Sequence, residues 1–380
     1  MPQLEDFQKI RPFEDNEVAQ VIQQLCNEPY FIHILPRIFP NVPVDVMVAK
    51  LKTIRSVAEF QDKCVIPFLH DLMAVTSTGL TVSGIENIDP QRNYLFISNH
   101  RDIVLDSALI NVTLREHGLN TSQIAIGDNL LIYDWITDLV KLNKSFLVLR
   151  NLSSVRQQME ASAMLSSYIR YAISDRKQNI WLAQREGRSK DGNDETQNSV
   201  LKMLNLSGKE DFASNFAQLQ ILPVAISYEY DPCDYLKAYQ FQLKRDDPSY
   251  KKSKDDDLEH MSLGIRGTKG GVHISFSKEI SIDELHNINA DNKNAQIQGL
   301  ASIIDKRIHS SYHLWPSNYI AFDELNGTSR FADKYTAEAK AVFDKRNEEH
   351  ISTKLQGCDK QFVLNAILSM YANPLINKLK

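Results

Sequence analysis

One histidine and two aspartates follow directly on a short apolar run. His100, Asp102 and Asp106 lie just after residues 94–98, whose sequence predicts a buried strand. A histidine held by a carboxylate can take a proton from a hydroxyl group near neutral pH, which is what acyl transfer to an alcohol requires. The stretch therefore indicates a general base at the end of a strand.

Three further strand-like runs each carry distinctive polar residues or a proline. Residues 144–150 end in Arg150, residues 181–183 lead into the polar segment 184–192, and residues 221–228 carry Pro223. A planar guanidinium can pair with two oxygens of a phosphate group, so these strand ends suit an anionic substrate. The candidates for contact with that substrate are Arg101, Arg150, Glu186, Gly187, Arg188 and Ser189, with Lys190 or Arg185 as further cations.

The four runs, in this order, resemble the glycerolipid acyltransferase superfamily of lysophosphatidate and glycerol-3-phosphate acyltransferases. The family's blocks are Asn-His-x4-Asp, a strand ending in Arg, Glu-Gly-x-Arg-Ser and a Val-Pro-Val strand. Residues 127–130 and 271–280 resemble the glycerol-3-phosphate branch, and the whole resemblance spans about residues 94–280. It implies an O-acyltransferase of membrane lipid synthesis. Such an enzyme moves a fatty acyl chain from a thioester, acyl-CoA or acyl carrier protein, to a hydroxyl of glycerol 3-phosphate or a lysophospholipid.

The resemblance implies that His100 is the general base, with an aspartate as its partner. Five residues separate His100 from Asp106, one more than in the family, and a bulge could absorb the extra residue. Asp106 is the favoured partner and Asp102 remains the alternative. In the third block, alignment on Arg188 places Arg185 where the family has its glutamate. The resemblance implies phosphate binding by Arg150 and Arg188, while Glu186 and Gly187 shape the substrate loop.

Other readings of the same residues remain open. Asn and Asp residues also begin helices, so Asn99 or Asp102 could serve only as a helix cap. An acceptor without phosphate, such as an amino-acid lipid, would suit the same chemistry. The two altered blocks are also compatible with a lipid-binding member of the fold that has lost catalysis. A serine hydrolase is disfavoured, because neither Ser145 nor Ser189 lies in a Gly-x-Ser-x-Gly turn.

The composition of the chain limits the kinds of ligand, metal site and membrane association that are expected. The 380 residues carry a net charge of −5, which argues against a nucleic-acid binder. The four cysteines are far apart and show no metal-ligand spacing, so they give little support for a disulfide framework or a zinc site. The resemblance implies no metal and no bound cofactor besides the thioester co-substrate. The N-terminus lacks the pattern of a secretory signal, and no apolar run reaches the ~18 residues of a spanning helix. We expect a cytoplasmic protein, peripheral on the inner face of the cytoplasmic membrane. Residues 31–39 and 361–371 are candidate contact segments, although each segment alone fits better as a helix packed on its own domain.

The elements that must position these residues form an α/β fold. Residues 94–276 alternate short apolar runs with helical patterns, which predicts an α/β sheet covered by helices. The resemblance implies that this central sheet is mixed and similar to that of glycerol-3-phosphate acyltransferases. We expect an N-terminal helical unit at residues 1–80 and an acyltransferase domain at 81–380, with its core at 94–280 and C-terminal helices at 281–380. Residues 245–259 are highly charged and are expected to form a solvated loop.

Overall fold

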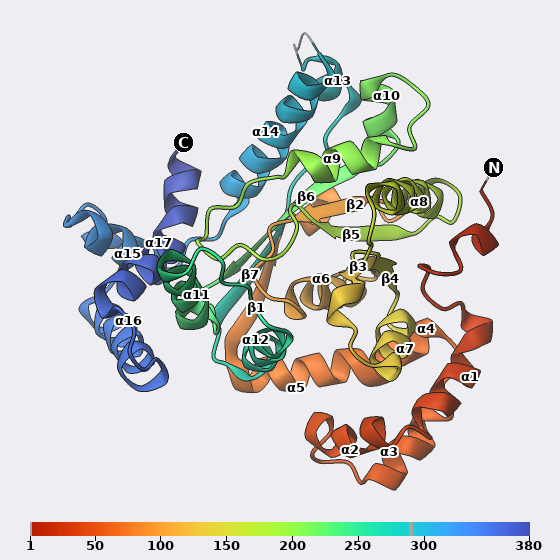
Figure 1. Ribbon diagram of the computed structural model, residues 1–380, viewed down its shortest axis with the longest axis horizontal. Coiled ribbons are helices and arrows are strands. Elements are labelled where there is room, and N and C mark those ends of the chain that lie inside the picture. The colour runs from red at the N-terminus through yellow and green to blue at the C-terminus, as the bar shows by residue number, and fades with distance from the viewer. Residues whose placement is uncertain (1, 289–291) are drawn as a thin grey trace.

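A seven-stranded β-sheet forms the centre of the computed structural model, which describes residues 2–288 and 292–380 (Figure 1). In space the strands follow the order β1-β7-β6-β2-β5-β3-β4, and every neighbouring pair is parallel except β6 and β7. This arrangement confirms the predicted α/β class with a mixed sheet. The strands are β1 (Ser77–Ser83), β2 (Leu95–Ser98), β3 (Ser122–Gly127), β4 (Ser145–Val148), β5 (Asn179–Ala183), β6 (Ile221–Tyr228) and β7 (Gly270–Phe276).

Helices cover both faces of the sheet, as the continuous apolar sequence of its central strands requires. All four residues of β2 are buried, and alternate residues of this strand enter two different cores. One core lies under α5 (Ile66–Thr76) and α6 (Leu105–Glu116). The helices of the other core are α8 (Val155–Ser174), α9 (Asn198–Asn205), α10 (Phe212–Ala217), α13 (Ile282–His286) and α14 (Lys293–Ser311).

The N-terminal helices form a core of their own. It includes Leu142 at the end of α7 (Asp134–Leu142), so this unit packs against the domain beside the strand ends. The boundary predicted at residue 80 falls inside β1, and the sheet therefore begins at Ser77. The helices of the unit are α1 (Asp15–Leu25), α2 (Pro29–Ile38), α3 (Val44–Leu51) and α4 (Val57–Phe60), which a π-turn (Gln61–Val65) joins to α5.

The C-terminal helices form a fourth core, on the β6 and β7 side of the sheet (Figure 1). They are α15 (Pro316–Asn326), α16 (Ala337–Glu349) and α17 (Lys360–Leu379), and they pack with α11 (Asp234–Asp246). Val363, Ile367 and Tyr371 of α17 are buried in this core, so these apolar side chains are not available to a membrane. Among the described residues, none of the helices is long and apolar enough to cross a bilayer.

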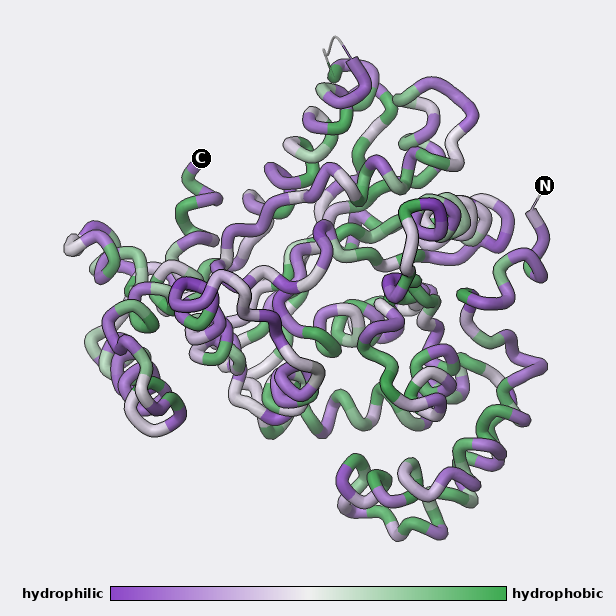
Figure 2. The backbone as a smooth tube through the Cα atoms, in the orientation of Figure 1, coloured by the Kyte–Doolittle hydropathy of each residue, from purple (hydrophilic) through white to green (hydrophobic). Residues whose placement is uncertain are grey.

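The charged segment 245–259 differs from the predicted loop. Most of it belongs to α11 and to a further helix, α12 (Lys254–Arg266), and Figure 2 shows both as largely hydrophilic. Ser253 and Asp256 form a reciprocal capping box, and three aspartates occupy the first turn of α12. Carboxylates stabilise the positive end of a helix dipole, so the same acidic run that indicated a solvated loop begins a helix.

Candidate active site

The candidate site begins where β2 ends, at Asn99. The side-chain amide of this residue makes hydrogen bonds to a neighbouring strand in the way that a backbone amide would. Asn99 is fully buried, accepts a hydrogen bond from the backbone N–H of Ile226 at 2.8 Å and donates to the carbonyl of Ile226 at 2.9 Å. Ile226 lies in the neighbouring strand β6, so this amide continues the pairing of the two strands past Ser98. The next residue, His100, is thereby fixed at the carboxyl edge of the sheet.

His100 is oriented by contacts on its ring and on one nitrogen. Its Nδ1 lies 2.8 Å from Oδ2 of Asp106, and the ring of Trp181 packs edge-on at 5.6 Å between centroids. The His100 side chain keeps 14% of its surface exposed, and Nε2 makes no hydrogen bond to any residue in 2–288 or 292–380. Nε2 is therefore the nitrogen that can exchange a proton with a substrate.

Asp106 is fully buried and accepts hydrogen bonds at both oxygens. Oδ2 accepts from His100 and from the backbone N–H groups of Arg101 at 2.6 Å and Asp102 at 3.0 Å. Oδ1 accepts from the hydroxyl of Tyr228 at 2.8 Å. Donors of this kind compensate the loss of hydration that a buried carboxylate suffers. The loop 99–104 thus wraps around the carboxylate that opens helix α6.

Asp102, the alternative partner, points elsewhere. Its Oδ1 accepts from the backbone N–H groups of Val104 at 2.9 Å and Leu105 at 2.8 Å, and so it caps the start of α6. Burial, followed by the neighbouring charge of Asp106, raises the pKa of Asp102. The structure therefore assigns the histidine contact to Asp106 and a capping contact to Asp102.

Sequence analysis did not select Tyr228, which completes this arrangement. It is the last residue of β6, and its hydroxyl reaches Asp106. Burial, with Asp106 and Asp102 nearby, raises the pKa of the phenol well above its usual value, so the hydroxyl stays protonated and donates. The only sequence signal was its position at the end of a strand whose neighbours carry site residues.

A backbone hydrogen bond joins the polar segment 184–192, the third block, to the loop that carries His100. The N–H of Ser189 donates to the carbonyl of His100 at 2.9 Å, and Ser189 is fully buried. The preceding Arg188 donates from Nη2 to Nδ1 of His260 on α12 at 3.0 Å. Its other terminal nitrogen, Nη1, is buried and has no hydrogen-bond partner among the described residues. This guanidinium forms no salt bridge within the described part of the chain.

Two other residues predicted to contact the substrate pair with each other at the surface. Arg150 donates to Glu186 at 2.7 Å, in a pair whose side chains are 35% and 69% exposed. Gly187 follows with φ of 68°, a conformation that glycine adopts without strain. The second and third blocks are therefore joined at the surface by an exposed ion pair, and the predicted phosphate contact of Arg150 would compete with it.

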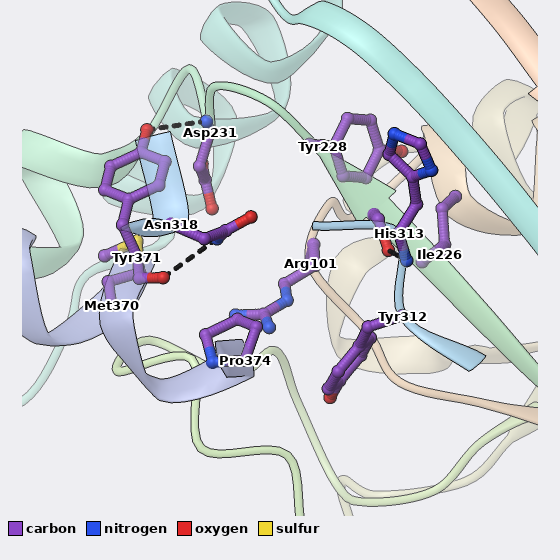
Figure 3. A pocket seen from close by; sticks show the side chains of 11 residues that line it. Arg101, Ile226, Tyr228, Asp231, Tyr312, His313, Asn318, Met370, Tyr371 and Pro374 are labelled. Atoms are coloured by element: carbon purple, nitrogen blue, oxygen red, sulfur yellow. Dashed lines mark hydrogen bonds between the residues drawn. The ribbon is translucent and has the colours of Figure 1, made fainter. Parts of the chain in front are cut away.

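Arg101 binds a buried carboxylate of its own. It donates to Asp194 at 2.6 Å, and Tyr312 donates its hydroxyl to the same oxygen. Arg101 and Tyr312 line a cavity of about 30 Å³ between β6 and α17, which also includes Asp231 and Tyr371 (Figure 3). A cavity of this volume holds a water molecule and no lipid substrate. Arg101 thus joins the loop that carries His100 to Asp194 and, through this carboxylate, to Tyr312. Substrate contact by Arg101 stays a prediction.

The described residues contain no group of three or more His, Cys, Asp or Glu side chains that could hold a metal ion. The four cysteines are unpaired, and three of them, Cys26, Cys64 and Cys233, are buried.

Comparison with known proteins agrees with this arrangement. Residues 79–228 match the family described as Acyltransferase, and this stretch contains His100, Asp106, Arg188 and Tyr228. Residues 79–228 therefore form an acyltransferase domain, as the resemblance to the glycerolipid acyltransferase superfamily predicted. No curated protein matches the sequence.

Among solved structures, one that is similar in part is an acyltransferase. The crystal structure of the 1-acyl-sn-glycerophosphate (LPA) acyltransferase PlsC from Thermotoga maritima has 14% sequence identity with this chain and a TM-score of 0.38. The alignment covers 77% of this chain and 91% of that one.

Proposed function

We propose that the protein is an O-acyltransferase that moves a fatty acyl chain from a thioester, acyl-CoA or acyl carrier protein, to a hydroxyl of glycerol 3-phosphate or a lysophospholipid. The observation that carries the proposal is the hydrogen bond from His100 Nδ1 to Asp106, which leaves Nε2 to act as the base. Acyl transfer to an alcohol requires such a base. The product would be a lipid, so we expect the enzyme to work against a membrane surface.

The chemistry needs only these residues and two substrates. Nε2 of His100 takes the proton of the acceptor hydroxyl while its oxygen attacks the thioester carbonyl carbon. The carbonyl electrons move to oxygen and form a tetrahedral intermediate. When they return, the C–S bond breaks, and the leaving sulfur receives the proton from Nε2. Asp106 holds the tautomer with the proton on Nδ1 and stabilises the imidazolium that forms between the two transfers. No acyl-enzyme and no cofactor take part.

An unbalanced set of cations supports a phosphate-bearing acceptor. Arg188 and its neighbour Lys190 form no salt bridges within the described residues, and Nη1 of Arg188 is buried without a partner. Burial, together with Lys252 and Arg188, lowers the pKa of Lys190 to about 8. Neighbouring cations repel one another, and a bound anion reduces this repulsion. A phosphate group also offers the paired oxygens that a guanidinium binds.

The test is thioester-dependent acylation by the purified protein, with glycerol 3-phosphate and lysophosphatidate as competing acceptors. We expect His100→Ala to abolish nearly all transfer while thermal unfolding stays cooperative. His70→Ala is the matched control, because His70 also contacts a carboxylate, Glu116 at 2.6 Å, but on the exposed surface. It should retain full activity.

The preferred acceptor also distinguishes the glycerol-3-phosphate branch of the family from the lysophosphatidate branch. Preference for glycerol 3-phosphate would place the enzyme with the glycerol-3-phosphate acyltransferases, and preference for lysophosphatidate with the second acylation step. Full activity in His100→Ala would overturn the proposed mechanism. A folded wild-type protein that transfers to neither acceptor would overturn the proposed substrate class.

A further inference from the structure

Helix α12 lies directly against the active-site loop, although it is outside the family match at residues 79–228. His260 and Gly264 are one turn apart and therefore share a face of the helix. A Cβ atom on Gly264 would lie 2.0 Å from Oδ2 of Asp102, so the helix backbone is in close contact with the loop that carries His100. His260, on the same face, is 2% exposed and reaches Arg188.

The hydrogen bond between Arg188 and His260 fixes the state of the imidazole. A guanidinium can only donate, so Nδ1 of His260 accepts and carries no proton. In a neutral imidazole the proton is then on Nε2, which must donate. The amide nitrogen of Gln240 on α11 lies 3.1 Å from Nε2, and the amide oxygen of the same side chain is buried without a partner among the described residues. Exchanging the two amide atoms by a 180° rotation lets the oxygen accept from Nε2 and satisfies both groups.

The charges around His260 favour the same neutral form. The charges that act on it most strongly are cations: Arg188 from the third block, Lys237 from α11, and Lys190 and Lys252 from the adjoining loops. Of these, Lys237 and Lys252 are paired with Asp231 and Asp257. Burial and these cations lower the pKa of His260 to about 3. The side chain therefore accepts a hydrogen bond from Arg188 without neutralising its charge, as a carboxylate would.

We infer that His260 is a positioning residue, which holds the guanidinium of Arg188 so that Nη1 is presented to the phosphate group of the acceptor. This role rests on the proposed function. Nη2 is occupied by the imidazole, whereas Nη1 is buried with no partner in the described residues. Because the partner is neutral, the full positive charge remains available to the substrate, and no anion of the protein has to be displaced.

Steady-state kinetics tests the inference with a matched set of variants. His260→Leu removes the acceptor, while His260→Asn places an amide oxygen close to the position of Nδ1. We expect His260→Leu to raise the KM for glycerol 3-phosphate about tenfold, as for a lost hydrogen bond to a charged group, with kcat and the thioester KM nearly unchanged. His260→Asn should recover most of the loss. His273→Leu is the control, because this half-buried imidazole bonds Thr81 and Ser83 on the β1 edge.

A second measurement does not depend on turnover. Nitrogen NMR of the histidine-labelled wild type should show His260 neutral with its proton on Nε2 between pH 6 and 8. Inorganic phosphate should shift this signal in the wild type and not in Arg188→Ala. A protonated Nδ1, or an unchanged KM in a folded His260→Leu, would overturn the positioning role. If no acceptor is acylated, the proposed function fails, and the tautomer and the phosphate titration still decide whether His260 positions Arg188 at an anion site.

Discussion

Replacing each of the two aspartates by asparagine separates the partner of the histidine from the helix cap. In Asp106→Asn the amide oxygen can face the three N–H donors that Oδ2 now accepts, while the amide nitrogen donates to the oxygen of Tyr228. All four contacts are thereby conserved. The change removes the negative charge beside His100 and leaves the imidazole tautomer in place.

The loss of the negative charge sets the expected decrease in kcat of Asp106→Asn. A hydrogen bond to a charged group contributes about 1.5–3 kcal/mol, against about 1 kcal/mol for a neutral pair. The imidazolium forms only during the reaction, so the lost ~0.5–2 kcal/mol falls on the transition state and lowers kcat about 2- to 30-fold. In Asp102→Asn the amide oxygen still caps Val104 and Leu105, and asparagine caps a helix about as well as aspartate. We expect its kcat to stay within about threefold of the wild type.

The assay is release of free thiol from the acyl thioester at saturating acceptor, with urea unfolding of each variant as the control for folding. Equal activity of Asp106→Asn and the wild type would refute the role of the carboxylate. A loss in Asp102→Asn as large as that in Asp106→Asn would refute the division of roles between the two residues.

Three further predictions concern the helix that covers the site and the cation it holds. Arg188→Ala should raise the KM for a phosphate-bearing acceptor about 10- to 100-fold with a smaller effect on kcat, measured by steady-state kinetics; an unchanged KM would contradict phosphate binding there. Gly264→Ala should destabilise the protein by about 1–3 kcal/mol in urea unfolding, because the methyl group meets Asp102 at 2.0 Å, whereas the same change in an open helix stabilises. Because the pKa of His260 is lowered from 6.5 to about 3, the unfolded chain binds its proton first on acidification. The wild type should therefore lose up to about 2 kcal/mol of unfolding free energy between pH 7 and pH 5 that His260→Asn does not lose, and equal pH dependence would show that His260 is not buried as a neutral group.

Local patterns in the sequence were enough to predict the strands of this protein and the site residues that follow them. Apolar runs followed by polar clusters predicted the strands and placed His100 and Arg188 at strand ends, because burial of a strand and exposure of its end are local properties of the chain. The order of these blocks then indicated the family. The same local reasoning failed at residues 245–259, where charge alone predicted a loop and the capping box of Ser253 and Asp256 begins a helix.

Only the tertiary structure decided which groups meet. Two aspartates lay within reach of His100, and the turn of the loop around Asp106 made that residue its partner and left Asp102 to cap α6. Tyr228 and His260 complete the contacts of Asp106 and Arg188 from elements that are distant in the sequence. Their positions depend on how β6 and α12 pack on the sheet, and the sum of many apolar contacts that fixes this packing has no local signature in the sequence.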